Sequence, residues 1–487
     1  MAAIVNTNIG SLYSQMHLAK TEDMLDKATE RLSSGNKINT AADDAAGMAI
    51  STRMVSQVRG LQMAVKNAND GLSMLNSVEG ALGEVTNMLQ RIRELSVQAV
   101  NDSNSGSDRL LIQQEVNQLT SEITRVSTNT RFNAERVLNG DLQSKSFQIG
   151  YEGGETVNFS VDDIQSSVLG AHTLTSTARA TIAAAAAPGA NSTTADADVI
   201  IHGNSVSKTL DVAAAASAKT VAAQINAVTG DTGVSASART YAKVLSTAAT
   251  ATYSLKINGT STGNMSIGSA SVGDAVTKIN QIKGTTGVTA TASADGTFVT
   301  LYHSAGEDIT VENESAGTNI DVFAVGYDGT TVAGSKQDLA AASGNDAATV
   351  IGNITLSSSR SFSVTQSGTT GYFTTGSASL SAVSNVDIKT VTGASSAIDT
   401  IDGALERILS ARSELGALQN RLERTINRLT TTVTSTEEAR SRIVDADYAL
   451  ETTRLTKAKI MQQASTAMLA QANQSKQNIL TLLNIFF

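Results

Sequence analysis

One unbroken helical stripe constrains this chain more than any other feature. Between residues 61 and 99, apolar residues recur in steps of three and four, the spacing of one helix face in near-heptad rhythm. The stripe consists of Leu61, Val65, Ala68, Leu72, Leu75, Val78, Leu82, Val85, Leu89, Ile92, Leu95 and Ala99. At about 1.5 Å per residue the helix would be roughly 58 Å long. So long and narrow a stripe has to be buried against other helices.

Two further stripes could supply those helices. After a loop at 101–108, in which Ser107 is placed to cap the next helix, apolar residues recur at Ile112, Val116, Leu119, Ile123 and Val126. A third stripe near the other end of the chain contains Ile398, Ile401, Leu405, Ile408, Leu415, Leu418, Leu422, Ile426, Leu429 and Val433. The sequence therefore predicts a long α-helical coiled coil or bundle built from both ends of the chain.

The segment AADDAAG at 41–47 could be mistaken for a metal-binding carboxylate pair. However, Thr40 precedes Asp43 by three residues, and Asp43 and Asp44 would lie in the first turn of a helix. Carboxylates are favoured there by the helix dipole. Helix capping therefore explains this segment better than metal binding.

The outermost segments, 1–34 and 454–487, carry narrower apolar stripes among Ala, Gln, Ser and Thr. Candidate assembly residues on these stripes are Ile4, Ile9, Leu12, Met16, Met461, Met468, Ile479 and Leu482. A single chain could bury them only poorly, so we expect both segments to be disordered until something packs against them.

Residues from about 173 to 383 differ in composition, because Gly, Ser, Thr and Ala dominate and short alternating runs indicate strands. This region contains an internal duplication, in which AAQINAVTGDTGVSASA from Ala222 aligns with VTKINQIKGTTGVTATA from Val276. Ile225 and Ile279 occupy the same position of the two copies, 54 residues apart. Each copy is predicted to contain a strand pair, a short helix and one or two further strands.

These patterns predict a mixed fold, with a helical core formed by both termini and a β-rich (α+β) outer insert. Residues 1–41 and 454–487 would form a terminal coiled-coil domain. Residues 42–172 and 384–453 would form a helical core domain with a β-hairpin. Residues 173–383 would form the outer insert, as two small α+β or β modules.

Composition excludes several functional classes. A formal charge of −9 gives no electrostatic basis for binding nucleic acid. No apolar stretch reaches the roughly 20 residues of a membrane helix, and the start lacks the basic region of a secretory signal. Without cysteine there is no disulfide, thiolate metal site or Cys nucleophile, and the four histidines are scattered. We therefore expect a structural or interaction protein, without cofactor, metal or catalytic residues, rather than an enzyme.

Several motifs resemble those of bacterial flagellin, the subunit of the flagellar filament. They are ERLSSGNKINTAADDAAGMAIS (30–51), LQRIREL (89–95), RFNAERVLNG (131–140), EEARSRIVDADYALET (437–452) and MLAQANQSKQNIL (468–480). The match covers roughly the first 170 and the last 100 residues, in order. The duplicated unit resembles the IN motif of flagellins and hook-associated proteins. The ending LLNIFF departs from the family, so the resemblance assigns no role to Phe486 or Phe487.

The resemblance implies a subunit of an extracellular, tubular filament for swimming, with the terminal helices innermost and the insert outermost. Implied partners are further copies of the chain, the hook-associated junction and cap proteins, and an export chaperone at the C-terminal segment. The flagellar type III system would export the chain without a cleaved signal. A chain with no cysteine and a single proline, Pro188, suits that route, because few slow steps limit its refolding.

The resemblance also implies that a host flagellin-sensing Toll-like receptor binds the monomer. The matching residues are Arg91, Leu95 and Gln98 on the long helix and Glu115 on the next. Arg91 would be a multidentate donor and Leu95 an apolar anchor beside it. Two alternative functions remain open: a hook–filament junction protein, which forms a single ring, and a filament-borne enzyme with its machinery in the insert.

Overall fold

The computed structural model describes residues 7–101, 103–194, 198–203, 206–246, 248–269, 271–293, 295–315, 318–340, 346–367 and 371–485, except the side chains of 183–185, 476 and 478–485. The chain divides into two compact units. One comprises Met1–Met74, Lys145–Phe159 and Ala417–Phe487, and the other comprises Leu75–Ser144 and Ser160–Gly416.

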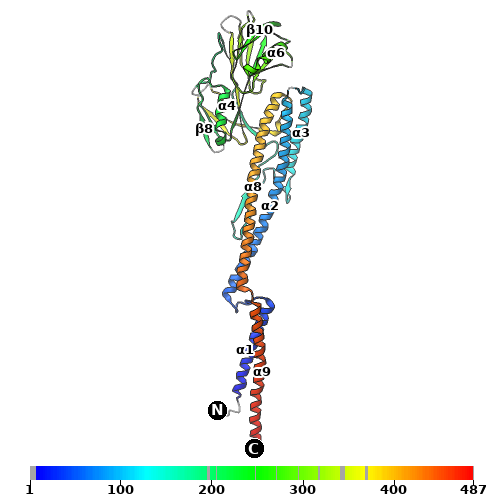
Figure 1. Ribbon diagram of the computed structural model, residues 1–487, viewed down its shortest axis with the longest axis vertical. Coiled ribbons are helices and arrows are strands. Elements are labelled where there is room, and N and C mark those ends of the chain that lie inside the picture. Colours follow the sequence, from blue (N-terminus) through cyan, green and yellow to red (C-terminus); the bar gives the residue numbers. More distant parts are fainter. Residues whose placement is uncertain are drawn as a thin grey trace. The chain divides into compact units, whose positions relative to one another are not determined.

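Three long helices account for the three apolar stripes: α2 (Ala45–Val100), α3 (Gly106–Asn129) and α8 (Val391–Val444) (Figure 1). Every residue of the α2 stripe is buried except Val65 and Leu72, which are half-buried. In the first unit Leu61 of α2 and Leu429 of α8 share a small apolar cluster. The predicted helices are confirmed, and so is the mixed fold of paired helical termini with a β-rich middle.

Ion pairs show that α2 and α8 run antiparallel within the second unit. Glu79 Oε1 of α2 lies 2.7 Å from Arg412 Nη2 of α8. Further along α2, Arg93 pairs with Asp402, so residue numbers rise on one helix as they fall on the other. Helix α3 is also antiparallel to α2, because Arg109 Nε near its start donates to the Ala99 carbonyl at 2.8 Å.

The starts of α2 and α3 correct two details of the sequence prediction. Ser105, not Ser107, is the N-cap of α3, since its hydroxyl accepts from Asp108 N at 3.2 Å while Asp108 accepts from Ser105 N at 2.9 Å. Two serines compete for this position, and Asp108 selects the one three residues before it. Ser107 therefore lies within the helix.

At α2, capping is confirmed, but the two aspartates have different roles. Asp44 lies outside the helix and accepts from Ala46 N and Gly47 N at 3.1 and 2.9 Å. Asp43 closes the preceding turn by accepting from the backbone N–H groups of Thr40 and Asn39. These bonds lower the pKa of Asp43. The prediction that both lie in the first helical turn is wrong, because the helix begins one residue later.

Two hairpins lie between α3 and the insert. The short one pairs β1 (Arg131–Phe132) with β2 (Glu135–Arg136), and the other pairs β3 (Lys145–Gln148) with β4 (Thr156–Phe159). In the second hairpin, Phe147 stacks on Phe159 with ring centroids 5.4 Å apart. The Phe147 ring reaches α2 at Gly71, where a Cβ would already lie 3.4 Å from the ring.

The insert consists of three antiparallel sheets and four short helices in its described part. The five-stranded sheet has the order β11 (Thr260–Gly268), β10 (Thr250–Ile257), β14 (Ile309–Asn313), β17 (Ala347–Val350) and β6 (Ile182–Ala185). The eight-stranded sheet runs β12 (Val288–Ala292), β13 (Phe298–His303), β9 (Ser235–Ser246), β18 (Asn353–Ser358), β5 (Gly170–Thr175) and β21 (Ser379–Ala382), with β15 (Ile320–Val325) pairing β9 and β16 (Val332–Leu339). The four-stranded sheet runs β20 (Gly376–Ser377), β19 (Ser363–Gln366), β7 (Val199–His202) and β8 (Ser207–Leu210). The helices are α4 (Ala218–Ala227), α5 (Thr229–Thr232), α6 (Gly273–Gln281) and α7 (Lys283–Thr286), and the short helix η1 (Val383–Asn385) follows β21.

The internal duplication is visible in equivalent contacts. In the first copy, Asn226 at the end of α4 donates to and accepts from the backbone of Ala236, at 2.9 and 2.8 Å. In the second copy, Asn280 of α6 makes the same two bonds with Ala290, at the same two distances. Each copy contains a strand pair, short helices and a following strand, as the sequence predicts.

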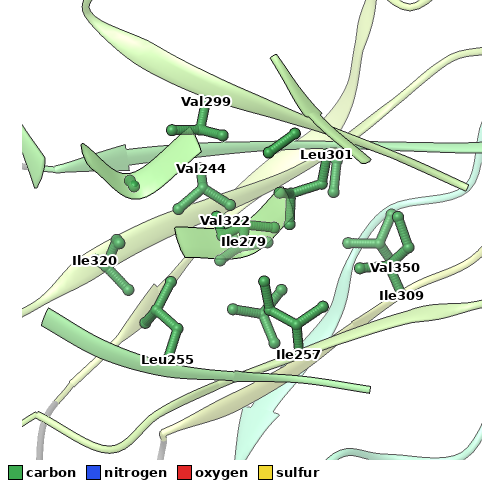
Figure 2. Packing of buried hydrophobic residues seen from close by; sticks show 14 of the residues in the cluster. Val244, Leu255, Ile257, Ile279, Val299, Leu301, Ile309, Ile320, Val322 and Val350 are labelled. Atoms are coloured by element: carbon green, nitrogen blue, oxygen red, sulfur yellow. The ribbon is translucent and has the colours of Figure 1, made fainter. Parts of the chain in front are cut away.

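Each copy contributes its helix to a separate apolar core. The smaller core surrounds Ile225 of α4. The larger core contains Ile279 of α6, Val244 of β9 and Ile257 of β10 (Figure 2). On β7, β10 and β14 alternate side chains are buried, which explains the alternating sequence pattern of these strands.

Candidate assembly and recognition surfaces

The terminal segments form two helices, α1 (Ile9–Ser34) and α9 (Tyr448–Ile485), that pack side by side (Figure 1). Asn8 caps α1, because its Oδ1 accepts from Ser11 N at 3.1 Å. Its Nδ2 donates to the Ala472 carbonyl of α9 at 3.2 Å. At the other end of α1, the Tyr448 hydroxyl donates to the Leu32 carbonyl at 3.2 Å. The two helices therefore run antiparallel.

Small side chains fill the contact between these helices. The buried residues of α1 are Ser11, Thr21 and Ala28, and those of α9 include Ala458 and Ser465; we call these five the small-residue seam. Thr21 and Ala28 are seven residues apart, as are Ala458 and Ser465, which is the spacing of a coiled-coil contact. Small side chains let two helices approach closely. The sequence prediction missed this seam, although the seven-residue spacing of small residues was its signal.

Large apolar side chains of the same helices are left exposed. Ile9, Leu12, Met16, Met461 and Met468, here called the outer apolar residues, are between 44% and 64% exposed. Tyr13, Met24 and Ile460 are also exposed. The expectation that one chain buries these residues poorly is confirmed. Of the other candidate assembly residues, Ile4 and the side chains of Ile479 and Leu482 lie outside the described residues, as do Phe486 and Phe487.

The structure differs from the expectation that the terminal segments are disordered without a partner. Both are helical and paired within one chain, because the small-residue seam supplies a contact that does not need the large apolar side chains. The outer apolar residues, rather than the helices, are what remains uncovered.

The structure brings two of the receptor-recognition candidates together on α2 and α3. Arg91 Nε lies 2.9 Å from Glu115 Oε1, and Arg91 Nη1 lies 3.1 Å from Glu94 Oε2. The hydrogen bond with Glu115, followed by that with Glu94, raises the pKa of Arg91. Gln98 is exposed one helical turn beyond Glu94. These groups form a polar surface of charged and amide side chains.

Leu95 is not part of that exposed surface. Its side chain is only 2% exposed, because it belongs to the buried α2 stripe. A partner that contacts Arg91 and Gln98 would meet Leu95 only by displacing neighbouring side chains. The expectation of an apolar anchor beside Arg91 is therefore not met at Leu95 in the free chain.

Neither a metal site nor a membrane span is found in the part of the chain that the structure describes. Within it, no group of three or more His, Asp or Glu side chains is placed to hold a metal ion. Its helices include none that combines the length and the apolar character needed to cross a bilayer.

Comparisons with protein families match most of the helical regions. The "Bacterial flagellin N-terminal helical region" matches residues 5–142, and the "Bacterial flagellin C-terminal helical region" matches residues 398–483. The "Flagellin hook IN motif" matches residues 198–249, which contain the first copy of the duplicated unit.

Similar proteins match almost end to end. The B-type flagellin of Pseudomonas aeruginosa is 37% identical, over 99% of this chain and 100% of the relative. Flagellin B of Vibrio anguillarum and the flagellin of Salmonella typhimurium are each 34% identical, with the same coverage.

Proposed function

Because this chain belongs to the bacterial flagellin family, we propose that its α1–α9 pair joins neighbouring subunits in the filament. The protein is a structural subunit that self-assembles into the extracellular flagellar filament, and it is not an enzyme. Relatives named flagellin over the full length favour this function over the junction-protein and enzyme alternatives.

The exposure of the outer apolar residues carries the proposal. Leu12, Met16 and Met468 are each more than half exposed on helices whose mutual seam is already closed. Fully burying a side chain of this size contributes about 1.5–3 kcal/mol. Several exposed large apolar side chains on one helix pair are typical of a protein–protein contact. Neighbouring subunits are the partners that a self-assembling chain provides.

Single carboxylate substitutions test this role. Leu12→Asp and Met468→Asp should each stop elongation of filament seeds, because a buried, unpaired carboxylate is costly. Circular dichroism should show an unchanged helical monomer, since both side chains are exposed in the free chain. Val332→Asp, at an exposed strand position of the insert, is the matched control and should elongate normally. Normal elongation by both α1 and α9 variants would contradict the proposal.

We further propose the three-part division of the chain in the filament. Residues 1–41 and 454–487 would line the inner tube, residues 42–172 and 384–453 would form the helical core, and residues 173–383 would lie outermost. The sheet supports this division, because Gly170 pairs with Ala382, so the chain enters and leaves the insert on neighbouring strands. Replacing residues 173–383 with a short linker should leave filament formation intact. A folded truncated monomer that cannot assemble would refute the division.

The filament partners of the family are proposed to bind the same terminal helices. At a filament end the α1–α9 surface of the last subunit lacks one neighbouring subunit. Junction and cap proteins would bind this uncovered surface. The exposed Ile460, Met461 and Met468 of α9 offer an export chaperone an apolar helix face. Met461→Asp/Met468→Asp should lose chaperone binding in a co-purification assay, and unchanged binding would contradict this contact.

Export by the flagellar type III system without cleavage predicts that extracellular subunits keep their N-terminal segment, as mass spectrometry would show.

We propose that the host receptor binds the monomer through Arg91, Gln98 and Glu115, with Leu95 supporting the surface from beneath. Arginine at the centre of such a contact commonly contributes about 1–3 kcal/mol. Arg91→Ala/Glu115→Ala should therefore weaken activation of receptor-expressing cells. Arg125→Ala is the control, because it removes a comparable exposed ion pair with Glu122 on α3. A double variant as potent as the unmodified monomer would remove this site.

A further inference from the structure

A groove of about 610 Å³ runs between α1 and α9. Its apolar lining includes Met24 and Ala28 from α1 and Ala458 and Met461 from α9. Met24 and Met461 are each more than two-fifths exposed, so the groove is open along its rim. An occupant could bury both methionines.

The groove also contains a compensated charge cluster. Arg454 Nη1 lies 2.7 Å from Glu451 Oε1, and Arg31 Nη1 lies 3.6 Å from the same oxygen. Arg31 also lies 3.7 Å from Asp43. Two guanidinium groups thus face two carboxylates, and their charges cancel.

Three lysines of the groove remain uncompensated. They are Lys20, Lys27 and Lys457, and none of their ammonium groups has an ion-pair partner in the described part of the chain. This local excess of positive charge stands out in a chain whose formal charge is −9. Lys20 and Lys27 are two helical turns apart, which corresponds to about 10 Å along α1.

A stripe of acidic side chains lies on another side of α1. Glu22, Asp26 and Glu30 recur every four residues, and Asp23 adjoins them. All four are exposed, and no ion pair involving them occurs among the described residues. The stripe spans about 12 Å, close to the separation of the groove lysines, and is turned about 110° from them around the helix axis. Glu22 and Asp26 therefore lie on a different side of α1 from its groove lysines, whereas Asp23, three residues after Lys20 and four before Lys27, lies beside them.

We infer that this acidic stripe of one subunit lies in the lysine-lined groove of the next. The inference rests on the proposed function and identifies which surfaces of α1 and α9 meet. The two surfaces differ, so the contact is head-to-tail and can repeat without closing, which generates a helical polymer rather than a two-fold dimer. Opposite charges set the register and speed the encounter of subunits. Salt weakens these steps, because the groups are partly exposed.

Charge reversal tests the contact in the full-length chain. The measurement is the critical concentration, the monomer left in solution after polymerisation with polyethylene glycol at low salt. Asp26→Lys and Lys457→Glu should each raise it at least tenfold, because each places like charges together. The double variant should return to within threefold of the unmodified chain, because the pairing is restored with its signs exchanged. Asp211→Lys, at an exposed position of the insert, changes net charge as much as Asp26→Lys and should have no effect.

Added salt supplies a second readout, since it should shrink the difference between the single variants and the unmodified chain. An unchanged critical concentration in Asp26→Lys and Lys457→Glu would overturn the inference. So would a double variant that assembles no better than the single ones. If Leu12→Asp and Met468→Asp block assembly while Asp26→Lys does not, the proposed function stands and only this contact is refuted.

Discussion

Replacing Ala458 with leucine should open the contact between α1 and α9 while leaving both helices formed. Ala458 is 3% exposed in the small-residue seam, where Thr21 and Ala28 are the buried side chains of α1. Leucine adds three carbon atoms to this close contact, and overpacking of that size costs about 1–3 kcal/mol. Alanine and leucine are both good helix formers, so the helix itself changes little.

Hydrogen exchange of the full-length monomer measures this cost. A loss of about 1–3 kcal/mol in local stability corresponds to roughly 5- to 150-fold faster exchange. The increase should appear in the α1 amides, because their protection depends on α9. Ala464→Leu is the matched control, because Ala464 is exposed on the same helix, and it should exchange within twofold of the unmodified chain.

Equal α1 exchange in Ala458→Leu and Ala464→Leu would refute the reasoning. That result would mean that the small-residue seam does not hold α1 against α9. Slower exchange in Ala458→Leu than in the unmodified chain would refute it as well, since it would require empty space in the seam.

Three further predictions concern single side chains. Ser105→Ala should destabilise the start of α3 by about 0.5–2 kcal/mol. Hydrogen exchange should then be faster at the first amides of α3. Equal effects of Ser105→Ala and Ser107→Ala would contradict the capping assignment. Asn226→Asp and Asn280→Asp each replace an N–H donor with an oxygen that faces a carbonyl, so each should cost about 0.5–1.5 kcal/mol, the net contribution of a typical hydrogen bond. Hydrogen exchange in β9 and β12 tests this, and a response at one site only would argue against equivalent copies. Hydrogen bonds from the Ser293 and Thr297 side chains lower the pKa of Asp295 to about 2. The ionised Asp295 carboxylate therefore stabilises the fold fully above pH 3.8, its ordinary pKa, and this stabilisation is lost as the pH falls through about 2. An NMR titration of Asp295 with a midpoint near pH 3.8 would refute this.

Local patterns predicted the helices well but left choices between neighbouring residues open. The α2 stripe is a periodic signal over many turns, so its buried face follows from spacing alone. Ser105 and Ser107 both suit a helix start, and only the reciprocal bond with Asp108 selects one of them. Asp43 and Asp44 are adjacent acids, and the residue at which α2 begins decides which of them caps it: Asp44 accepts from the first helical turn, whereas Asp43 accepts from the preceding turn.

The candidate surfaces were predictable only in part. Arg91 and Glu115 are close together because α2 and α3 are antiparallel neighbours, which their stripes and the short loop already suggest. The burial of Leu95 was implied by its membership of the same stripe, yet family resemblance alone assigned it a surface role. On α1 and α9 the sequence pattern predicted contacts through the large apolar residues. The contact between the two helices is formed instead by the small ones.

The sequence by itself determined the long helices, the composition change of the insert and its duplicated unit, because spacing, capping and turn residues act within a few positions of the chain. Only the tertiary structure decided which side of α1 meets α9, since a helix with several stripes has no local preference among them. It also decided that β9 pairs with β18, where Ser237 lies opposite Thr355 across more than a hundred residues. Such pairings depend on which surfaces together bury the most apolar area, and that is a property of the whole chain.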